Sequence, residues 1–207
     1  MSLASVNDFV VKFANVNGSG SASANELFAR SILRMGVPIS PRNIFPSNIQ
    51  GLPTWFEVRI TEAGHLGRRG GVDLMVAMNP QTWDKDVAEI EPGGFLFYDS
   101  TKPLPPAKFR DDITVLGVPL TAMCNARYQL PRERQLFKNI VYLGALAGLL
   151  GIDPTVIEAI SSSACTIAKL LRPVSASTRY FTQYFWNASA SDDDGVIGYQ
   201  AQTVAPP

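Results

Sequence analysis

The sequence is poor in the residues that build most catalytic and metal sites. Its 207 residues include one histidine, His65, and two cysteines, Cys124 and Cys165. Two isolated cysteines form neither a disulfide framework nor a four-cysteine metal or iron–sulfur site. His65 lies in a loop of glycine and arginine, so we expect it at the surface. Neither cysteine is arranged with it as a nucleophile that a histidine base would activate. Both cysteines are expected to be small buried residues.

The sequence also lacks an excess of charge and a long apolar segment. Eighteen Lys and Arg balance eighteen Asp and Glu, and no long basic run forms the surface of a nucleic-acid-binding protein. The longest strongly apolar stretch, residues 140–152, is shorter than the roughly 20 residues of a membrane span. The start MSLASVNDF lacks the basic and apolar regions of a signal peptide. We therefore expect no nucleic acid and no membrane as partner, and a cytoplasmic location.

What the sequence does have is enough apolar material, 46% of its residues, for one substantial core. Short segments rich in β-branched and aromatic residues alternate with segments of helical periodicity. Strands are predicted at residues 9–14, 54–61, 72–78, 93–100 and 113–120. Helices are predicted at residues 22–35 and 136–152. Two further helices are predicted to start after the N-caps Asn79 and Asp153, each of which is followed by a proline, Pro80 and Pro154. This alternation predicts an α/β domain with a mostly parallel sheet and helices on both faces.

Two stretches of the chain follow no regular pattern. Residues 121–135 are polar, and we expect them to be irregular. After Ser161 the helix can continue, but the remaining chain is rich in serine, acidic residues and proline. We expect a folded domain over residues 8–160, and a helix extension with a poorly ordered tail over residues 161–207.

A glycine- and serine-rich turn, NVNGSGSAS, joins the first predicted strand to the first predicted helix. Gly18, Gly20 and Ser23 approximate the dinucleotide fingerprint G-x-G-x-x-G/A, but no acidic ribose anchor follows in residues 39–45. No Gly-Lys-Ser/Thr follows either, so the turn is not a P-loop. Its free backbone N–H groups and serine hydroxyls could hold an anion or a carbonyl. Equally, its glycines could serve only to let strand and helix pack closely.

Two segments together resemble a known family. NVNGSGSASANELFARSILRMG followed by NIFPSNIQGLPTWFEVRI is similar to the gamma domain of the 2-oxoacid:ferredoxin (acceptor) oxidoreductases, in the version found at the N-terminus of their alpha subunits. VDLMVAMNPQTW, GGFLFYDS and KNIVYLGALAGLLGI continue the same pattern in the same order. The resemblance covers about residues 8–160. It implies a Rossmann-like three-layer α/β domain.

The resemblance also implies an activity that several chains share. Family members oxidatively decarboxylate a 2-oxoacid such as pyruvate or 2-oxoglutarate with thiamine diphosphate, form an acyl-CoA, and pass electrons through iron–sulfur clusters to ferredoxin or a similar acceptor. The gamma domain packs against the thiamine-binding domains, on the CoA side of the active site. Thiamine diphosphate, magnesium and iron–sulfur clusters are therefore expected on partner chains, with CoA as co-substrate. We expect this chain to work in an oligomer and to be inactive alone.

Site residues follow from the resemblance by position. The family's glycine turn, which would face the cofactor, corresponds to Gly18, Ser19, Gly20 and Ser21. An active-site-facing loop corresponds to Pro46, Ser47, Asn48, Gln50 and Gly51. Asn139, at the start of the apolar helix, matches an asparagine that recurs there. No catalytic residue and no metal ligand is expected in this chain.

The sequence departs from the complete enzymes of this family in two respects. It has no Gly-Asp-Gly element with a downstream asparagine for a thiamine-bound magnesium, and its two cysteines cannot ligate a cluster. The leading hypothesis is therefore a gamma domain that completes an active site on partner chains. Two alternatives stay open: a free-standing Rossmann-like module that binds CoA or a nucleotide, and a non-catalytic scaffold.

Overall fold

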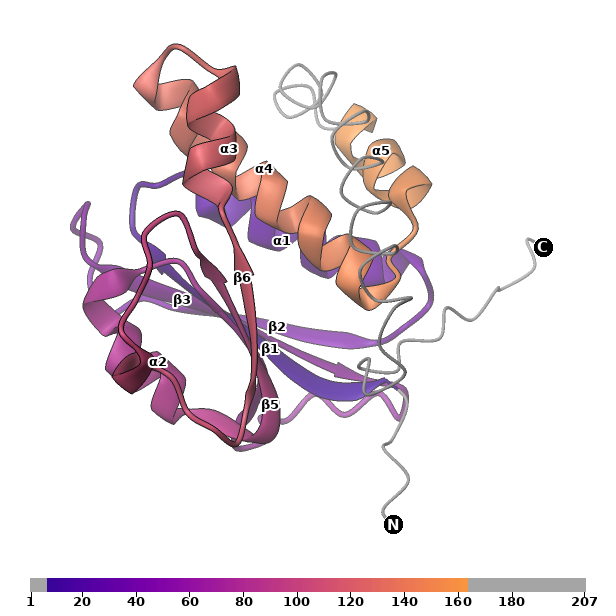
Figure 1. Ribbon diagram of the computed structural model, residues 1–207. Coiled ribbons are helices and arrows are strands. Elements are labelled where there is room, and N and C mark those ends of the chain that lie inside the picture. The colour runs from indigo at the N-terminus through magenta and orange to yellow at the C-terminus, as the bar shows by residue number, and fades with distance from the viewer. Residues whose placement is uncertain (1–6, 164–207) are drawn as a thin grey trace, which may run out of the picture.

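The computed structural model describes residues 7–163, and residues 1–6 and 164–207 lie outside the described part. Within that part, six strands form one sheet in the order β2-β3-β1-β4-β5-β6 (Figure 1). The strands are β1 (Asp8–Val16), β2 (Ile39–Ile44), β3 (Pro53–Thr61), β4 (Val72–Ala77), β5 (Ile90–Asp99) and β6 (Thr114–Val118). β1, β4, β5 and β6 pair in parallel, whereas β3 runs antiparallel between β2 and β1. The predicted mostly parallel sheet is confirmed.

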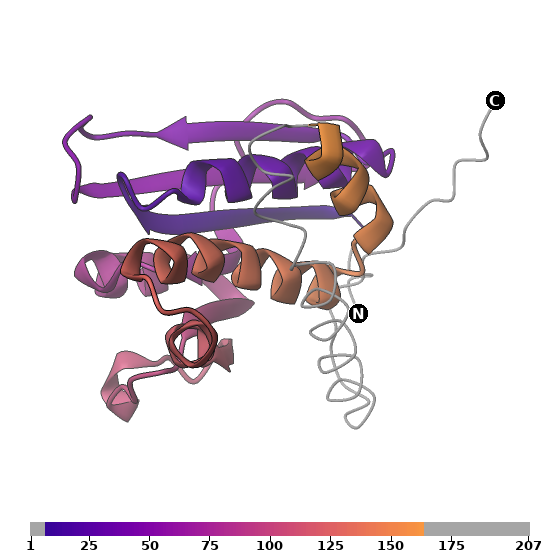
Figure 2. The same ribbon diagram turned by 90° about the horizontal axis from the view of Figure 1, so that it is seen from above.

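Helices cover both faces of this sheet, as Figure 1 and Figure 2 show. The helices of the described chain are α1 (Ser21–Arg34), α2 (Trp83–Ala88), α3 (Leu120–Arg127), α4 (Pro131–Leu150) and α5 (Pro154–Ser163), with two 3-10 turns, η1 (Pro80–Thr82) and η2 (Pro106–Lys108). α1 and α4 lie side by side over one face, with α3 and α5 beside them, and α2 covers the other face. This is the three-layer α/β arrangement that the sequence predicts.

Apolar side chains fill the space on each side of the sheet. On the larger side, the ring of Phe13 in β1 lies 5.1 Å from the ring of Phe28 in α1 and 6.2 Å from that of Tyr142 in α4. On the other side, Met75 of β4 and Trp83 of α2 belong to a smaller core. β1 is central and buried on both faces, as strands of parallel sheets are. The glycine turn after β1 therefore lies at the middle of the sheet edge.

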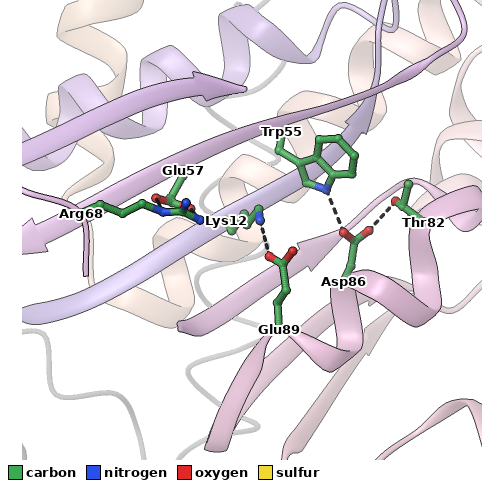
Figure 3. A network of polar contacts seen from close by, with 7 residues as sticks. All are labelled: Lys12, Trp55, Glu57, Arg68, Thr82, Asp86 and Glu89. Atoms are coloured by element: carbon green, nitrogen blue, oxygen red, sulfur yellow. Dashed lines mark hydrogen bonds and ion pairs between the residues drawn. The ribbon is translucent and has the colours of Figure 1, made fainter. Parts of the chain in front are cut away.

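A buried polar network fastens α2 to the sheet (Figure 3). Lys12 of β1 is only 4% exposed and pairs with Glu89, the residue after α2. Asp86 of α2 accepts hydrogen bonds from Nε1 of Trp55, at 2.8 Å, and from the Thr82 hydroxyl. Burial raises the pKa of the Asp86 carboxyl, although these hydrogen bonds and the nearby Lys12 act to lower it. The Lys12–Glu89 ion pair and the hydrogen bonds to Asp86 thus link α2 to β1 and β3, and removal of Glu89 would leave the buried Lys12 charge without this partner.

The loop between β3 and β4 closes over the same face of the sheet. Arg68 donates two hydrogen bonds, of 3.1 and 3.2 Å, to the carboxylate of Glu57 (Figure 3). Arg59 donates to the carbonyl oxygen of Gly67 at 2.6 Å. His65 lies in this loop and is exposed, as the sequence predicts.

Residues 121–135 form most of α3 and the first turn of α4, so the prediction of an irregular segment is wrong. The backbone N–H of Thr121 donates to Oδ1 of Asp99, at the end of β5, over 3.2 Å. Because this cap of α3 comes from another element, the local sequence carries no start signal. α4 begins at Pro131, earlier than the predicted residue 136, with a largely exposed and therefore polar first turn. Apolar periodicity does not identify such a turn.

The two predicted N-caps are confirmed. Oδ1 of Asn79 accepts from the backbone N–H of Gln81 at 3.0 Å, and Oδ1 of Asp153 accepts from that of Thr155 at 2.8 Å. The continuation of α5 beyond Ser163 and the predicted tail lie outside the described residues. Between residues 7 and 163, no helix has both the length and the hydropathy needed to cross a membrane.

Candidate functional site

The glycine turn between β1 and α1 is held in a fixed backbone shape. The N–H of Ser19 donates to the carbonyl oxygen of Val16 at 3.1 Å, which closes the turn. Gly18 and Gly20 have φ of +83° and +77°, a region that residues with a Cβ rarely adopt. Gly20 is the N-cap of α1 and provides no side-chain cap. The first N–H groups of α1 therefore receive no capping side chain, and they can serve a bound acceptor.

Neighbouring side chains also leave little room for a Cβ at either glycine. A Cβ at Gly18 would lie 2.7 Å from Cγ of Gln50, and a Cβ at Gly20 would lie 2.7 Å from Cδ2 of Leu136. The first contact comes from the loop after β2, and the second comes from α4. The turn is therefore enclosed on two sides by segments that are far from it in the sequence.

Asn17 joins the glycine turn to the predicted active-site-facing loop. Its N–H donates to the carbonyl oxygen of Leu52 at 2.8 Å, and its carbonyl oxygen accepts from the N–H of Gly51 at 3.0 Å. Its side-chain amide donates to the carbonyl oxygen of Ile49 at 3.2 Å. Three bonds thus hold the two segments together. Asn17 is not among the site residues that the sequence indicates, because a local pattern does not specify a partner more than 30 residues away.

Asn139 fixes the turn from the other side. Its Nδ2 donates to the carbonyl oxygen of Ser19 at 2.9 Å. The side chain is buried at the start of the apolar part of α4, where the sequence places it. The structure therefore brings Ser19 and Asn139 together, as expected if both belong to one site.

Two pockets open on either side of the turn. The first, here called the turn pocket, has a volume of about 420 Å³ and is lined by Gly18, Ser19, Gln50, Gly51 and Asn139 among others. The second, here called the amide pocket, has a volume of about 350 Å³ and is lined by Gly18, Gly20, Ser21, Asn15, Asn25 and Asn43 among others. No charged residue of the described chain lines the amide pocket. These linings include seven of the ten site residues that the sequence analysis selects.

The remaining three, Pro46, Ser47 and Asn48, lie farther out on the loop and line neither pocket. The hydroxyl of Ser47 accepts from the N–H of Ile49 at 3.2 Å, so it shapes the loop itself. Asn48 and Pro46 are exposed. Their position makes them candidates for contact with another chain.

Asn15 carries a buried amide donor that has no partner among the described residues. The residue is 3% exposed and lines both pockets, and its Nδ2 makes no hydrogen bond there. Its carbonyl oxygen accepts a hydrogen bond of 3.4 Å from Nδ2 of Asn79. A buried donor without an acceptor costs about 1–3 kcal/mol. An oxygen atom of a bound molecule would remove that cost, so Asn15 is a further candidate binding residue, one that no local sequence pattern indicates.

Two titratable groups near the site, Tyr142 and Cys124, are held in their neutral forms. Tyr142 of α4 donates to Oδ1 of Asn25 at 2.7 Å beneath the amide pocket, and burial raises the pKa of this phenol. Cys124 of α3 is buried, and burial raises its pKa to about 11. The structure thus confirms the expectation of a small buried residue for Cys124, whereas Cys165 lies outside the described chain.

A family model described as pyruvate ferredoxin/flavodoxin oxidoreductase matches residues 10–166. The chain belongs to this family. No curated protein matches the sequence. The resemblance that the sequence analysis draws from the glycine turn and the FPSNIQG loop is confirmed.

Solved structures of this family share the fold. A 2-oxoglutarate:ferredoxin oxidoreductase from Magnetococcus marinus, with 2-oxoglutarate, coenzyme A and succinyl-CoA bound, is 20% identical over 91% of this chain, with a TM-score of 0.72. Pyruvate oxidoreductase subunit PORC from Thermotoga maritima is 18% identical over 86% of this chain and 96% of its own, with a TM-score of 0.64. A keto/oxoacid ferredoxin oxidoreductase gamma subunit from Geobacter sulfurreducens is 21% identical over 89% of this chain and 99% of its own, with a TM-score of 0.59. The matched part spans 32% of the Magnetococcus chain.

Proposed function

We propose that this chain is the gamma domain of a thiamine diphosphate-dependent 2-oxoacid:ferredoxin (acceptor) oxidoreductase. It would complete the active site on partner chains during oxidative decarboxylation of a 2-oxoacid to an acyl-CoA. Family membership supports this role. The observation that carries it is the double loop that Asn17 builds at the C-terminal end of β1, the edge where α/β proteins bind ligands.

The surface of this double loop supports a contact with another chain. Phe45, Ile49 and Leu52 are 52%, 65% and 38% exposed and lie within one short segment beside both pockets. Apolar side chains gathered in this way favour burial against another protein. We propose the thiamine-binding chain as that protein, with the iron–sulfur chain and ferredoxin, or a similar acceptor, as further partners of the complex.

In this proposal, partner chains hold the metals and thiamine diphosphate, and this chain contributes to binding of the co-substrate CoA. Residues 7–163 contain no group of three His, Cys, Asp or Glu side chains that could hold a metal ion. In this proposal, magnesium and iron–sulfur clusters are held by the partner chains. Thiamine diphosphate on a partner would supply the decarboxylation chemistry. The turn of this chain would bind and orient a co-substrate such as CoA through backbone N–H groups and the Asn15 amide.

Co-expression with the thiamine-binding and iron–sulfur chains tests this function. We expect the chains to purify together and to reduce a dye when a 2-oxoacid and CoA are supplied. Ile49→Asp should abolish both results, because a charge would enter the proposed contact. Leu66→Asp is the matched control, since Leu66 is 75% exposed on the loop between β3 and β4. Failure of the unmodified chains to associate or to react would refute the proposal.

The second candidate function is a free-standing module that binds CoA or a nucleotide. The unpaired amide of Asn15 favours it, since this donor could bind an oxygen atom of a ligand. Both pockets are also formed by residues of this chain alone. Calorimetric titration of the isolated protein with CoA, NAD and FAD tests it. Binding that Gly20→Asp removes would support the module. A scaffold instead predicts that substitutions of Ser19 and Asn48 leave the turnover and CoA dependence of the assembled enzyme unchanged.

A further inference from the structure

The two edges of the sheet differ in how they are protected against pairing. One edge is β2, which carries Pro41 and Arg42, both exposed. Proline and charged side chains on an edge strand hinder its pairing with another chain. The opposite edge is β6, which leads directly into α3 (Figure 1). The residues of β6, Thr114–Val118, include no charged residue and no proline, so this edge lacks both kinds of protection.

Backbone groups of β6 point away from the sheet at every second position. Within residues 7–163, β5 is the only strand that pairs with β6. The carbonyl oxygen of Val118 accepts from the N–H of Ser100 at 2.9 Å, so the backbone groups of Val118 face β5. Because this direction alternates along a strand, the backbone groups of Val115 and Gly117 face outward. Each of these two residues therefore offers an N–H and a carbonyl oxygen to a further strand.

The side chains of β6 leave room for a further strand. Val115 is 37% exposed, and Thr114 and Gly117 are exposed as well. Leu116 is half-buried at the margin of the larger core. A row of outward backbone groups flanked by such side chains is a template for strand addition.

A second copy of the same strand fits this edge in an antiparallel register centred on Leu116. Val115 of each copy then lies opposite Gly117 of the other copy, and the two residues exchange both of their backbone hydrogen bonds. This register uses every outward N–H and carbonyl oxygen of both residues. Leu116 lies opposite Leu116 of the second copy, with Cα atoms roughly 4.5 Å apart, so their apolar side chains meet.

The distribution of charge is compatible with self-pairing. Residues 113–121 contain no charged side chain, so no like charges meet where the two strands pair. Asp111 and Asp112, which precede β6, would lie beside the uncharged residues 120–121 of the other copy. Asp112 is also paired with Arg110. An acidic or basic strand would repel its own copy and would instead require a partner of opposite charge.

We propose that β6 pairs with β6 of a second copy of this chain, so that the two sheets become one continuous sheet. The contact is isologous and closes after two copies, which leaves no β6 edge open to further pairing. Because the paired segment is short, the dimer is weak and its population depends on protein concentration. The contact concerns this chain by itself, so the inference does not rest on the proposed function.

Sedimentation equilibrium of the full chain over a range of concentrations tests the dimer. We expect a monomer–dimer equilibrium. Val115→Pro removes an outward N–H but no hydrogen bond to β5, so it should raise the dimer dissociation constant about tenfold or more. Val115→Thr is the matched control, since it keeps the N–H and the branched side chain. Arg42→Glu is the control on the opposite edge, and both controls should dimerise like the unmodified chain.

Charge exchange at position 115 separates loss of the contact from damage to the fold. In the proposed register, the two copies of position 115 are diagonal neighbours, about 7–8 Å apart and within reach of long side chains. Val115→Lys and Val115→Glu should each weaken dimerisation, because like charges then meet. An equimolar mixture of the two variants should regain it as a heterodimer. A mixture that associates no better than either variant alone overturns the register.

Hydrogen exchange identifies what occupies the edge. The N–H groups of Val115 and Gly117 should exchange slowly at high protein concentration and rapidly at low concentration. A chain that is monomeric at every concentration, or a dimer that Val115→Pro does not weaken, overturns the proposal. Protection of both amides in a monomer also overturns it, since another segment of the same chain would then cover β6. Ile49→Asp should leave dimerisation unchanged, so this test is separate from that of the proposed partner contact.

Discussion

The side-chain amide of Asn139 donates a 2.9 Å hydrogen bond to the carbonyl oxygen of Ser19, although 120 positions separate the two residues in the sequence. This bond fastens α4 to the glycine turn. Asn17 fastens the loop after β2 to the other side of the same turn. The candidate site is therefore built from three segments whose relative positions depend on a few hydrogen bonds.

Replacement of Asn139 tests how far this bond stabilises the turn. Asn139→Ala leaves the carbonyl oxygen of Ser19 without its donor, so the free energy of unfolding should fall by about 1–3 kcal/mol. Gln135→Ala is the control one turn earlier on α4, because Gln135 is exposed and lines the same pocket. Urea denaturation of both variants gives the comparison. Equal stabilities would show that the bond contributes nothing.

Gly20→Ala should destabilise the protein more than Gly64→Ala. Both glycines have positive φ, +77° and +72°, so each alanine costs about 1–2 kcal/mol of backbone strain. A Cβ at Gly20 also collides with Leu136, whereas a Cβ at Gly64 meets nothing within 4 Å. The collision should add about 1–3 kcal/mol, measured as a difference in unfolding free energy.

A double variant separates the two contributions. In a Leu136→Ala background, Gly20→Ala should cost close to what Gly64→Ala costs, because the colliding methyl group is absent. If the excess cost of Gly20→Ala persists in that background, contact with Leu136 is not its cause.

Asp86 and Asp99 should give stability profiles of opposite sign. The pKa of Asp86 is raised above its ordinary 3.8 by burial, so the folded state binds this proton more readily than the unfolded state. Its contribution to stability must then decline as the pH rises from about 3.8 through the raised value. The pKa of Asp99 is lowered, so its contribution is present above 3.8 and is lost as the pH falls below it.

Asparagine variants isolate each contribution. Compared with Asp86→Asn, the unmodified protein should become less stable as the pH rises above 3.8. Compared with Asp99→Asn, it should become more stable as the pH rises toward 3.8 from below. Chemical denaturation between pH 3 and 7 measures both differences. Profiles of the same sign would contradict the assigned causes of the two shifts.

Cys124 should be unreactive in the folded protein. Its pKa of about 11 leaves only roughly 0.1% thiolate at pH 8, and its side chain is buried. In a Cys165→Ser variant, a disulfide reagent should modify Cys124 no faster than the protein unfolds. Rapid modification under native conditions would show that α3 opens locally, and addition of denaturant provides the positive control.

The sequence by itself determined the class of fold and the elements that local rules describe. β1 and β3 are buried on both faces along most of their lengths, as their apolar content indicates. The helix starts at Asn79 and Asp153 carry caps within two residues of the groups they bind. Glycine at positions 18 and 20 permits the positive φ that the structure shows there, because residues with a Cβ rarely adopt it. These features involve interactions over a few residues, so their signals are contiguous.

Only the tertiary structure decided how the site is assembled. The cap of α3 comes from Asp99, the partners of Asn17 come from the loop after β2, and the free amide of Asn15 becomes evident only once its surroundings are packed. Residue type and spacing do not encode these contacts, because each depends on two distant segments meeting across the sheet edge. Packing of the helices on the sheet therefore settles which polar groups are paired and which remain available to a ligand.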